Sequence, residues 1–404
     1  KQAIRDAARV LGLPFSSGDR VAKLMPPMIL GNTATISECL SLDEENTSGY
    51  SKEFYSASEE LRKQYKNDEE AKQIIDIALG LEGLRRQDGI HAAAIVISPD
   101  TITKFLPIQQ KGSNAEIVTQ YEMHTVEQLG LLKMDFLGLR NLSIVDRTLE
   151  LIGSESLDID NLKLDDEKTF KLFAEGKMTG VFQLESRVAQ STSRSLKPKR
   201  FEDIVALVAL IRPGPLGAGM HNEFADRANN RKEIEYLHSD LESILNETYG
   251  VILYQEQVMQ IAEKIAGFNL QEADNLRVAM GKKIPKVMEE QRKKFTDGAV
   301  SNNYSEQFAI ELFDQIAYFA GYGFNKSHSV PYALLAYQTA YLKANYPAEY
   351  IAACLTAVKR DKDRTAIFLS EARDMGVKVS TPDVNLSSSD FTVNDNEILF
   401  GLSA

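Results

Sequence analysis

Residues 131–140 read LLKMDFLGLR, and apolar residues alternate with charged ones along part of this stretch. Every second position from 132 to 136 is apolar, namely Leu132, Met134 and Phe136. Successive side chains of a strand point to opposite faces, so the stretch predicts a half-buried strand with Lys133 and Asp135 on the face opposite to the apolar one. This pair suits a metal-bound polyphosphate, because a carboxylate holds a divalent cation and an ammonium group neutralises a phosphate oxygen. The simpler alternative is a local salt bridge at a sheet edge.

The composition is that of a soluble globular protein. The chain has 404 residues, 43% of them apolar and 26% charged, which fits two or three domains with large cores. No apolar run is long enough to span a membrane and the first residues do not resemble a signal peptide, so we expect a cytoplasmic protein. Cys39 and Cys354 stand far apart, which argues against a zinc site or a disulfide framework.

Charge is segregated along the chain. The net charge of −12 argues against a protein that coats nucleic acid over its whole surface. Residues 41–70 carry nine acids and four bases, whereas 186–200 carry five bases and no acid, and 277–294 carry seven bases and two acids. The two basic blocks fit a local phosphate-binding channel, and a solvated face is the alternative for each block taken alone.

Periodicity predicts an α+β fold that is predominantly α-helical. The first helix ends at Gly12, and no periodicity follows until about residue 56. Ser58 and Asp68 are predicted to cap the next two helices. Strands are predicted at 91–98, 116–121, 131–137, 377–380 and 391–400. Helices are predicted at 142–152, 166–175, 201–211, 255–267, 271–281, 306–320, 331–345, 347–357 and 362–374.

Three cations gather where one of these helices is predicted to end. Gly281 is a natural helix stop, and Arg277 lies one turn before it. Lys282 and Lys283 follow in a bend before Pro285. Such a cluster clamps a triphosphate by point charge and fork geometry. The alternative, which needs no ligand, is that these cations complement the dipole at the end of the helix.

A second cluster lies at residues 319–329, which read FAGYGFNKSHS. Its glycines let the backbone approach a ligand closely, and Tyr322 offers a stacking face. The hydrogen-bond donors that follow are Asn325, Lys326, Ser327 and His328. A new helix is predicted to open at Pro331. The segment suits a base together with its sugar and phosphate.

Arg212 stands at a helix break, where residues 212–215 read RPGP. A structural turn is the default interpretation of this segment, because proline ends a helix rigidly. A phosphate-facing arginine is the alternative.

Together these segments resemble the alpha subunits of bacterial DNA polymerase III, the C family of replicative polymerases. The matching blocks include 132–140, 180–187, 201–215, 247–260, 280–283, 321–328 and 337–349. Their order and spacing make the match more specific than any single motif. Segments such as 221–222 and 341–350 are most similar to the actinobacterial branch.

The resemblance implies a layout of a helical thumb at 1–88, the C-terminal part of the palm sheet at 89–140 and a large helical fingers domain at 141–404. It also implies that the chain is a fragment. A phosphoesterase-like domain and a palm strand with paired Asp-x-Asp carboxylates are expected before residue 1, and a clamp-binding segment and nucleic-acid modules after residue 404. Expected partners are primer-template DNA and dNTP, with the sliding clamp and the proofreading exonuclease bound through the missing regions.

The resemblance also implies roles for the candidate residues. Asp135 corresponds to the third catalytic carboxylate, a ligand of Mg²⁺ in a two-metal site that lies partly outside this chain, and Lys133 faces phosphate. The expected nucleotide-binding residues are Arg277, Lys282, Lys283, Tyr322, Asn325, Lys326 and His328, with Arg212 and His91 as weaker candidates. Because one carboxylate cannot bridge two metal ions, we expect the isolated fragment to have no polymerase activity.

Two departures from the family pattern motivate other hypotheses. Val278 stands where relatives have a second basic residue, and 188–195 lacks the usual apolar stripe, so this segment is either a loop or a more loosely packed helix. A catalytically silent nucleic-acid-binding or replisome scaffold protein would fit these changes. A generic phosphate-binding module unrelated to replication is the third hypothesis.

Overall fold

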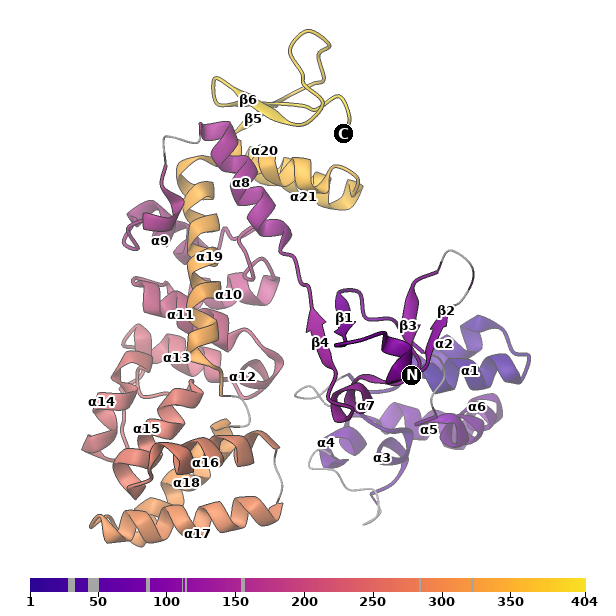
Figure 1. Ribbon diagram of the computed structural model, residues 1–404, viewed down its shortest axis with the longest axis vertical. Helices are drawn as coiled ribbons and strands as arrows, with labels where there is room; N and C mark the ends of the chain where they lie inside the picture. Colours follow the sequence, from indigo (N-terminus) through magenta and orange to yellow (C-terminus); the bar gives the residue numbers. More distant parts are fainter. Residues whose placement is uncertain are drawn as a thin grey trace. The chain divides into compact units, whose positions relative to one another are not determined.

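The computed structural model describes residues 1–404 except 28–32, 43–50, 85–87, 111, 113–114, 154–156, 283–284 and 321–322. It divides into two compact units, Lys1–Pro27 with Thr33–Arg140, and Asn141–Ala404 (Figure 1). Helices predominate and the strands are short, so the predicted fold class is confirmed. Among the described residues, no helix combines the length and the apolar character that a membrane crossing requires.

The first unit begins with a helical part. Its helices are α1 (Gln2–Val10), α2 (Phe15–Lys23), α3 (Ile36–Leu40), α4 (Ser51–Ser56), α5 (Glu59–Asn67) and α6 (Glu69–Leu81). Ile4, Ala7 and Ala8 of α1 are buried and form one apolar stripe along the helix. The cap at Asp68 is confirmed, because its carboxylate accepts the Ala71 N–H at 3.1 Å.

Two expectations for this helical part are wrong. Ser58 precedes α5 without a side-chain cap, because its hydroxyl donates to the Phe54 carbonyl instead. The stretch without periodicity contains α2, α3 and α4. In α2 the mid-helix Gly18 resembles a loop signal, yet a Cβ there would lie 2.7 Å from Ala8 Cβ, so the glycine allows α1 and α2 to pack closely.

The rest of the first unit holds two small antiparallel sheets. The elements are β1 (Ala94–Ile97), η2 (Ile102–Lys104), β2 (Ile108–Gln110), β3 (Ile117–Thr119), α7 (Met123–Gln128) and β4 (Leu132–Asp135). β1 pairs with β4 and β2 pairs with β3. The register of the first pair places Ala94 opposite Asp135 and Val96 opposite Lys133. Three of these strands are predicted, whereas β2 and α7 are not.

The apolar face of β4 is exposed, which contradicts the prediction of a half-buried strand. The exposed fractions are 54% for Leu132, 39% for Met134 and 60% for Phe136. Ile95 and Ile97, which lie opposite Met134 and Leu132 on β1, are exposed as well. The predicted alternation of side chains between the two faces is therefore confirmed. Within this unit, however, the apolar face is not the one that other residues cover.

The covered side of β1 and β4 is the one that carries Val96 and Lys133. Val96 packs against a small buried cluster formed by Leu106, Val126 and Leu131. Leu106 follows η2, Val126 lies in α7 and Leu131 directly precedes β4. The alternating sequence of β4 predicts that its two faces differ, but it does not predict which face packs against the rest of the unit.

The second unit is a long helical assembly that ends in a small sheet. Its elements are α8 (Arg140–Ile152), η3 (Ile159–Asn161), α9 (Glu167–Glu175), α10 (Arg187–Leu196), α11 (Phe201–Leu210), α12 (Pro213–Gly217), α13 (Met220–Ala228), η4 (Ser239–Leu241), α14 (Glu242–Leu245), η5 (Asn246–Thr248), α15 (Gln255–Ala266), α16 (Leu270–Lys282), α17 (Pro285–Ser301), α18 (Glu306–Ala320), α19 (Lys326–Asn345), α20 (Pro347–Val358), α21 (Lys362–Asp374), β5 (Lys378–Ser380), β6 (Thr392–Asn394) and β7 (Glu397–Leu399). In the sheet, β7 lies between β5, to which it is parallel, and β6, to which it is antiparallel.

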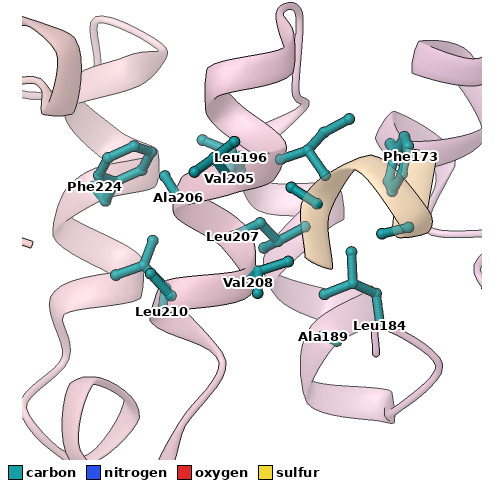
Figure 2. Packing of buried hydrophobic residues seen from close by; sticks show 14 of the residues in the cluster. Phe173, Leu184, Ala189, Leu196, Val205, Ala206, Leu207, Val208, Leu210 and Phe224 are labelled. Carbon is teal, nitrogen blue, oxygen red and sulfur yellow. The ribbon is translucent and has the colours of Figure 1, made fainter. Parts of the chain in front are cut away.

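α11 forms the centre of the largest core of this unit. Every residue from 203 to 210 is buried, and Figure 2 shows Leu207, Val208 and Leu210 surrounded by side chains of neighbouring helices. α19 runs alongside α9 and α11 (Figure 1). Burial of each large aliphatic side chain contributes about 1.5–3 kcal/mol, so this core holds the α9–α13 region and α19 together.

A separate core joins α15, α16, α17 and α18. Ile261, Phe295 and Ile316 are fully buried in it, and Leu276 of α16 packs there as well. α17 is not predicted, because its basic block leaves only a sparse apolar face around Phe295 and Ala299. A Cβ at Gly298 would lie 2.2 Å from the Ala266 carbonyl oxygen, so this glycine allows α17 to touch the end of α15.

The structure decides between the two alternatives for residues 187–196, and it differs from the predicted start of one helix and the predicted end of another. Residues 187–196 form the helix α10, so the loop alternative is wrong; its buried stripe of Ala189, Thr192, Ser193 and Leu196 contains two hydroxyls, which hide the periodicity. α19 starts at Lys326 with Pro331 inside it, because Asn325 caps the helix before the proline. α16 continues through Gly281 to Lys282.

Candidate functional site

In the first unit, β4 holds Lys133 and Asp135 in direct contact. The Lys133 Nζ donates to Asp135 Oδ1 at 2.6 Å, and the two side chains are 23% and 38% exposed. His91 Nδ1 lies 4.0 Å from the same carboxylate oxygen and accepts the Ala93 N–H at 3.3 Å. The Lys133 hydrogen bond holds the pKa of the Asp135 carboxyl below its usual value of 3.8, and the positive charge of Lys133 acts in the same direction. Asp135 is therefore a carboxylate at neutral pH.

Asp135 fits the role of one metal ligand. It is ionised and partly exposed, which a ligand of a divalent cation requires. Within the described ranges, however, no group of three or more His, Cys, Asp or Glu side chains could hold a metal ion. A divalent cation takes several oxygen ligands, so a complete site needs groups beyond those that the described residues bring together.

In the second unit, the segment 323–328 is fixed to the chain that leads into α15. Phe324 forms a parallel bridge with Tyr254, because its N–H donates to the Leu253 carbonyl at 3.1 Å and its carbonyl accepts the Gln255 N–H at 2.9 Å. The Gln255 side chain also donates to the Gly323 carbonyl at 3.2 Å. These bonds place the first turn of α19 beside the first turn of α15.

Asn325 and Lys326 are both engaged by this arrangement. Asn325 Oδ1 accepts the His328 N–H at 3.0 Å and so caps α19. The Lys326 N–H donates to both carboxylate oxygens of Glu256 at 3.0 Å, and its Nζ donates to Glu247 Oε2 at 2.7 Å. The ammonium group also lies 5.6 Å from the centre of the Tyr254 ring. Lys326 is thus an ion-paired cation that remains 35% exposed.

Arg212, Phe324, His328 and Tyr332 form a row of neighbouring groups, with Phe324 and His328 edge-to-face and His328 and Tyr332 tilted, and we call it the aromatic row. The Arg212 guanidinium lies 4.2 Å from the centre of the Phe324 ring. The His328 ring lies 5.5 Å from Phe324 and 4.3 Å from Tyr332. Burial lowers the pKa of the Arg212 guanidinium, and its Nε donates to the Ala209 carbonyl at 3.0 Å. An arginine remains a cation under these conditions, so the row joins one positive charge to three aromatic faces.

The structure describes only part of the remaining predicted nucleotide-binding residues. Arg277 forms an ion pair at 2.8 Å with Asp274, three residues earlier on the same helix. Lys282 is the last residue of α16, and its side chain lies outside the described part of the structure. Lys283 and Tyr322 also lie outside the described residues.

Sequence reasoning missed the acidic groups beside Lys326. Glu247 belongs to η5 and Glu256 to the first turn of α15, and neither contact can be inferred from spacing because both residues are at least 70 positions from Lys326. The signal for Glu256 was its place at the start of a helix, where carboxylates are favoured. Tyr254, which is buried between them, has its hydroxyl pKa raised by burial and by both carboxylates.

The comparisons with known proteins cover the whole chain. Residues 1–138 match the family described as bacterial DNA polymerase III alpha NTPase domain, and 141–303 match the bacterial DNA polymerase III alpha subunit finger domain. The chain is 45% identical over 419 residues to the DNA polymerase III subunit alpha of Buchnera aphidicola, 42% over 413 to that of Mycobacterium tuberculosis and 44% over 417 to that of Escherichia coli. Each alignment covers 100% of this chain and 34% of the relative.

The chain belongs to the DNA polymerase III alpha subunit family. It spans about a third of the length of the curated family members that it matches. The two family matches meet between residues 138 and 141, close to the boundary between the two structural units at Arg140. The division of the first unit into thumb and palm, and the extension of the fingers to residue 404, stay predictions.

Proposed function

We propose that this chain is part of a DNA-directed DNA polymerase that transfers dNMP from dNTP to a primer 3′-hydroxyl in chromosomal replication. The observation that carries the proposal is the ionised Asp135 on β4, in a chain whose relatives are named DNA polymerase III subunit alpha. Primer-template DNA and dNTP are the proposed substrates. The sliding clamp and the proofreading exonuclease are proposed partners of regions outside this chain.

In this proposal Asp135 supplies one oxygen ligand for Mg²⁺. When bound, two such ions lower the pKa of the primer hydroxyl and stabilise the leaving pyrophosphate. Lys133 lowers the pKa of the Asp135 carboxyl and presents an ammonium group that can contact phosphate. His91 lies next to the same carboxylate, so it stays a weak candidate of this site.

The proposed nucleotide contacts of the second unit are Lys326 and the aromatic row. Lys326 supplies a point charge for a phosphate, and the Phe324 and His328 rings supply faces against which a base can stack. Arg212 at the end of the row is a further phosphate candidate. Arg277, Lys282, Lys283, Tyr322 and Asn325 stay in the proposed nucleotide set.

The test is primer extension by a full-length alpha subunit that contains this chain, with Asp135→Asn. A metal ligand contributes several kcal/mol of transition-state stabilisation, so we expect a rate loss of at least about 100-fold. Asp100→Asn is the matched control, because Asp100 is another exposed carboxylate of the first unit that pairs with a lysine, Lys104. A normal extension rate for the Asp135 variant would refute the proposal.

A catalytically silent scaffold protein is the second candidate. It is favoured by Val278, which carries no charge, and by Arg277, which is paired with Asp274. The helical packing of α10 weakens it, because the segment 188–195 is not a loop. Primed-DNA binding by the full-length protein without any extension would support this alternative.

A further inference from the structure

The Lys326 ammonium group already has an anionic partner. Glu247 Oε2 lies 2.7 Å from Lys326 Nζ, a distance typical of the contact between an ammonium group and a phosphate oxygen. The two side chains are 35% and 32% exposed, so an anion from solution can reach the pair. An ion pair of this exposure contributes little net free energy and is readily exchanged.

The backbones of both partners are held in place. The Glu247 carbonyl accepts a hydrogen bond from Arg200 Nη2 at 2.8 Å, and the Arg200 guanidinium lies 5.1 Å from the centre of the Tyr249 ring. The Lys326 N–H is held by both oxygens of Glu256. An exchange of partners at Lys326 Nζ therefore requires only side-chain rotation of Glu247 and Lys326.

We propose that Glu247 is a placeholder for a phosphate group, so that a polyphosphate must displace its carboxylate from Lys326 in order to bind. The proposal rests on the proposed function, because it takes Lys326 as a phosphate contact. Glu247 then positions the Lys326 side chain and also determines which anions can bind to it. A single weak anion gains too little from Lys326 to replace a tethered carboxylate, whereas a triphosphate brings several charges and further contacts.

The same group of charges explains why displacement, and not simple addition, is required. Two carboxylates bind Lys326: Glu247 accepts from its ammonium group and Glu256 from its backbone N–H. The buried Tyr254 ring lies beside the ammonium group. Glu256 is committed to the backbone of α19, so it stays in place when the ligand binds. Only Glu247 is free to leave through its side chain.

The experiment measures binding of inorganic tripolyphosphate to the 404-residue chain by calorimetry at low salt, where screening is weak. Glu247→Gln keeps the size and one acceptor but removes the charge, and we expect its Kd to fall by roughly two- to fivefold. The gain should vanish when Lys326→Gln is added, because the two side chains act on one contact. Orthophosphate should bind more weakly than tripolyphosphate to the wild-type chain.

Glu185→Gln is the matched control. Glu185 pairs with Arg364 at 3.0 Å in the same unit with similar exposure, so the variant makes the same charge change away from Lys326. Circular dichroism checks that each variant is folded. If Glu247→Gln does not fold, Glu247→Asp moves the charge away by one methylene group and should give a smaller gain of the same sign.

The outcomes separate the two proposals. If Lys326→Gln weakens binding while Glu247→Gln binds no more tightly than Glu185→Gln, the placeholder is refuted and the nucleotide site survives. If Lys326→Gln binds tripolyphosphate as tightly as the wild-type chain, Lys326 is not a phosphate contact. The placeholder proposal is then refuted, and Lys326 leaves the proposed nucleotide set.

Discussion

Each unit contains a lysine–carboxylate pair of the same length in a different environment. Lys133 and Asp135 in the first unit and Lys343 and Glu371 in the second are both 2.6 Å apart. The Lys343 side chain is 1% exposed and also donates to the carbonyls of Lys177 and Thr179. Lys133 is 23% exposed.

The difference shows that distance alone does not assign a role. Lys343 uses all three of its donors inside the protein, so it joins α19 to α21 and to the loop before α10. Burial lowers its pKa while Glu371 acts in the opposite direction, as expected for a charge that has left water. The pair on β4 keeps access to solvent and can exchange a partner for a ligand.

The largest expected effect is the loss of the buried pair. Lys343→Met leaves the Glu371 carboxylate and two carbonyls without their donor, and we expect it to lower the free energy of unfolding of the second unit by about 3–5 kcal/mol. Hydrogen exchange of α19 measures the loss, because it reports each unit separately. Lys133→Met is the control and should leave exchange in β4 nearly unchanged. Equal changes in hydrogen exchange for Lys343→Met and Lys133→Met would refute the difference between the buried and the exposed pair.

A second contrast concerns two leucines. Leu207 in α11 is fully buried, whereas Leu132 in β4 is 54% exposed. We expect Leu207→Ala to cost about 2–5 kcal/mol through the cavity that it leaves, and Leu132→Ala at most about 0.5 kcal/mol. Urea unfolding with hydrogen-exchange readout in each unit measures both. A large cost for Leu132→Ala would show that the apolar face of β4 is covered in solution.

The smallest expected effect is a shift in titration. The folded-state pKa of Asp135 is lowered, so its contribution to stability is present above the ordinary value of 3.8 and is lost as the pH falls through the lowered value. Lys133→Met should raise the pKa toward 3.8, as measured by NMR of the carboxyl carbon. The pKa of Asp100, which is lowered chiefly by Lys104, is the internal control and should not change. An unchanged pKa of Asp135 in the Lys133→Met variant would mean that Lys133 does not lower this pKa.

Helices with a clear apolar period were predictable from local sequence. The bounds of α21 agree with the predicted 362–374, and α11, α15 and α20 agree within one residue. The misses have physical causes: α10 buries hydroxyls, α17 is dominated by charge, and α2 contains a glycine that packing requires. In each case a tertiary neighbour, such as the Phe173 carbonyl that accepts the Ser193 hydroxyl, supplies what the local pattern lacks.

The sequence by itself determined the family resemblance, the predominantly helical fold class and the shared strand face of Lys133 and Asp135, because each depends on residues close together in the chain or on the order of motifs. Only the tertiary structure decided which face of β4 is covered and which carboxylate holds Lys326. Glu247 is 79 positions from Lys326. Such a contact is set by how α15 and α19 pack, and packing depends on side chains from many distant elements at once.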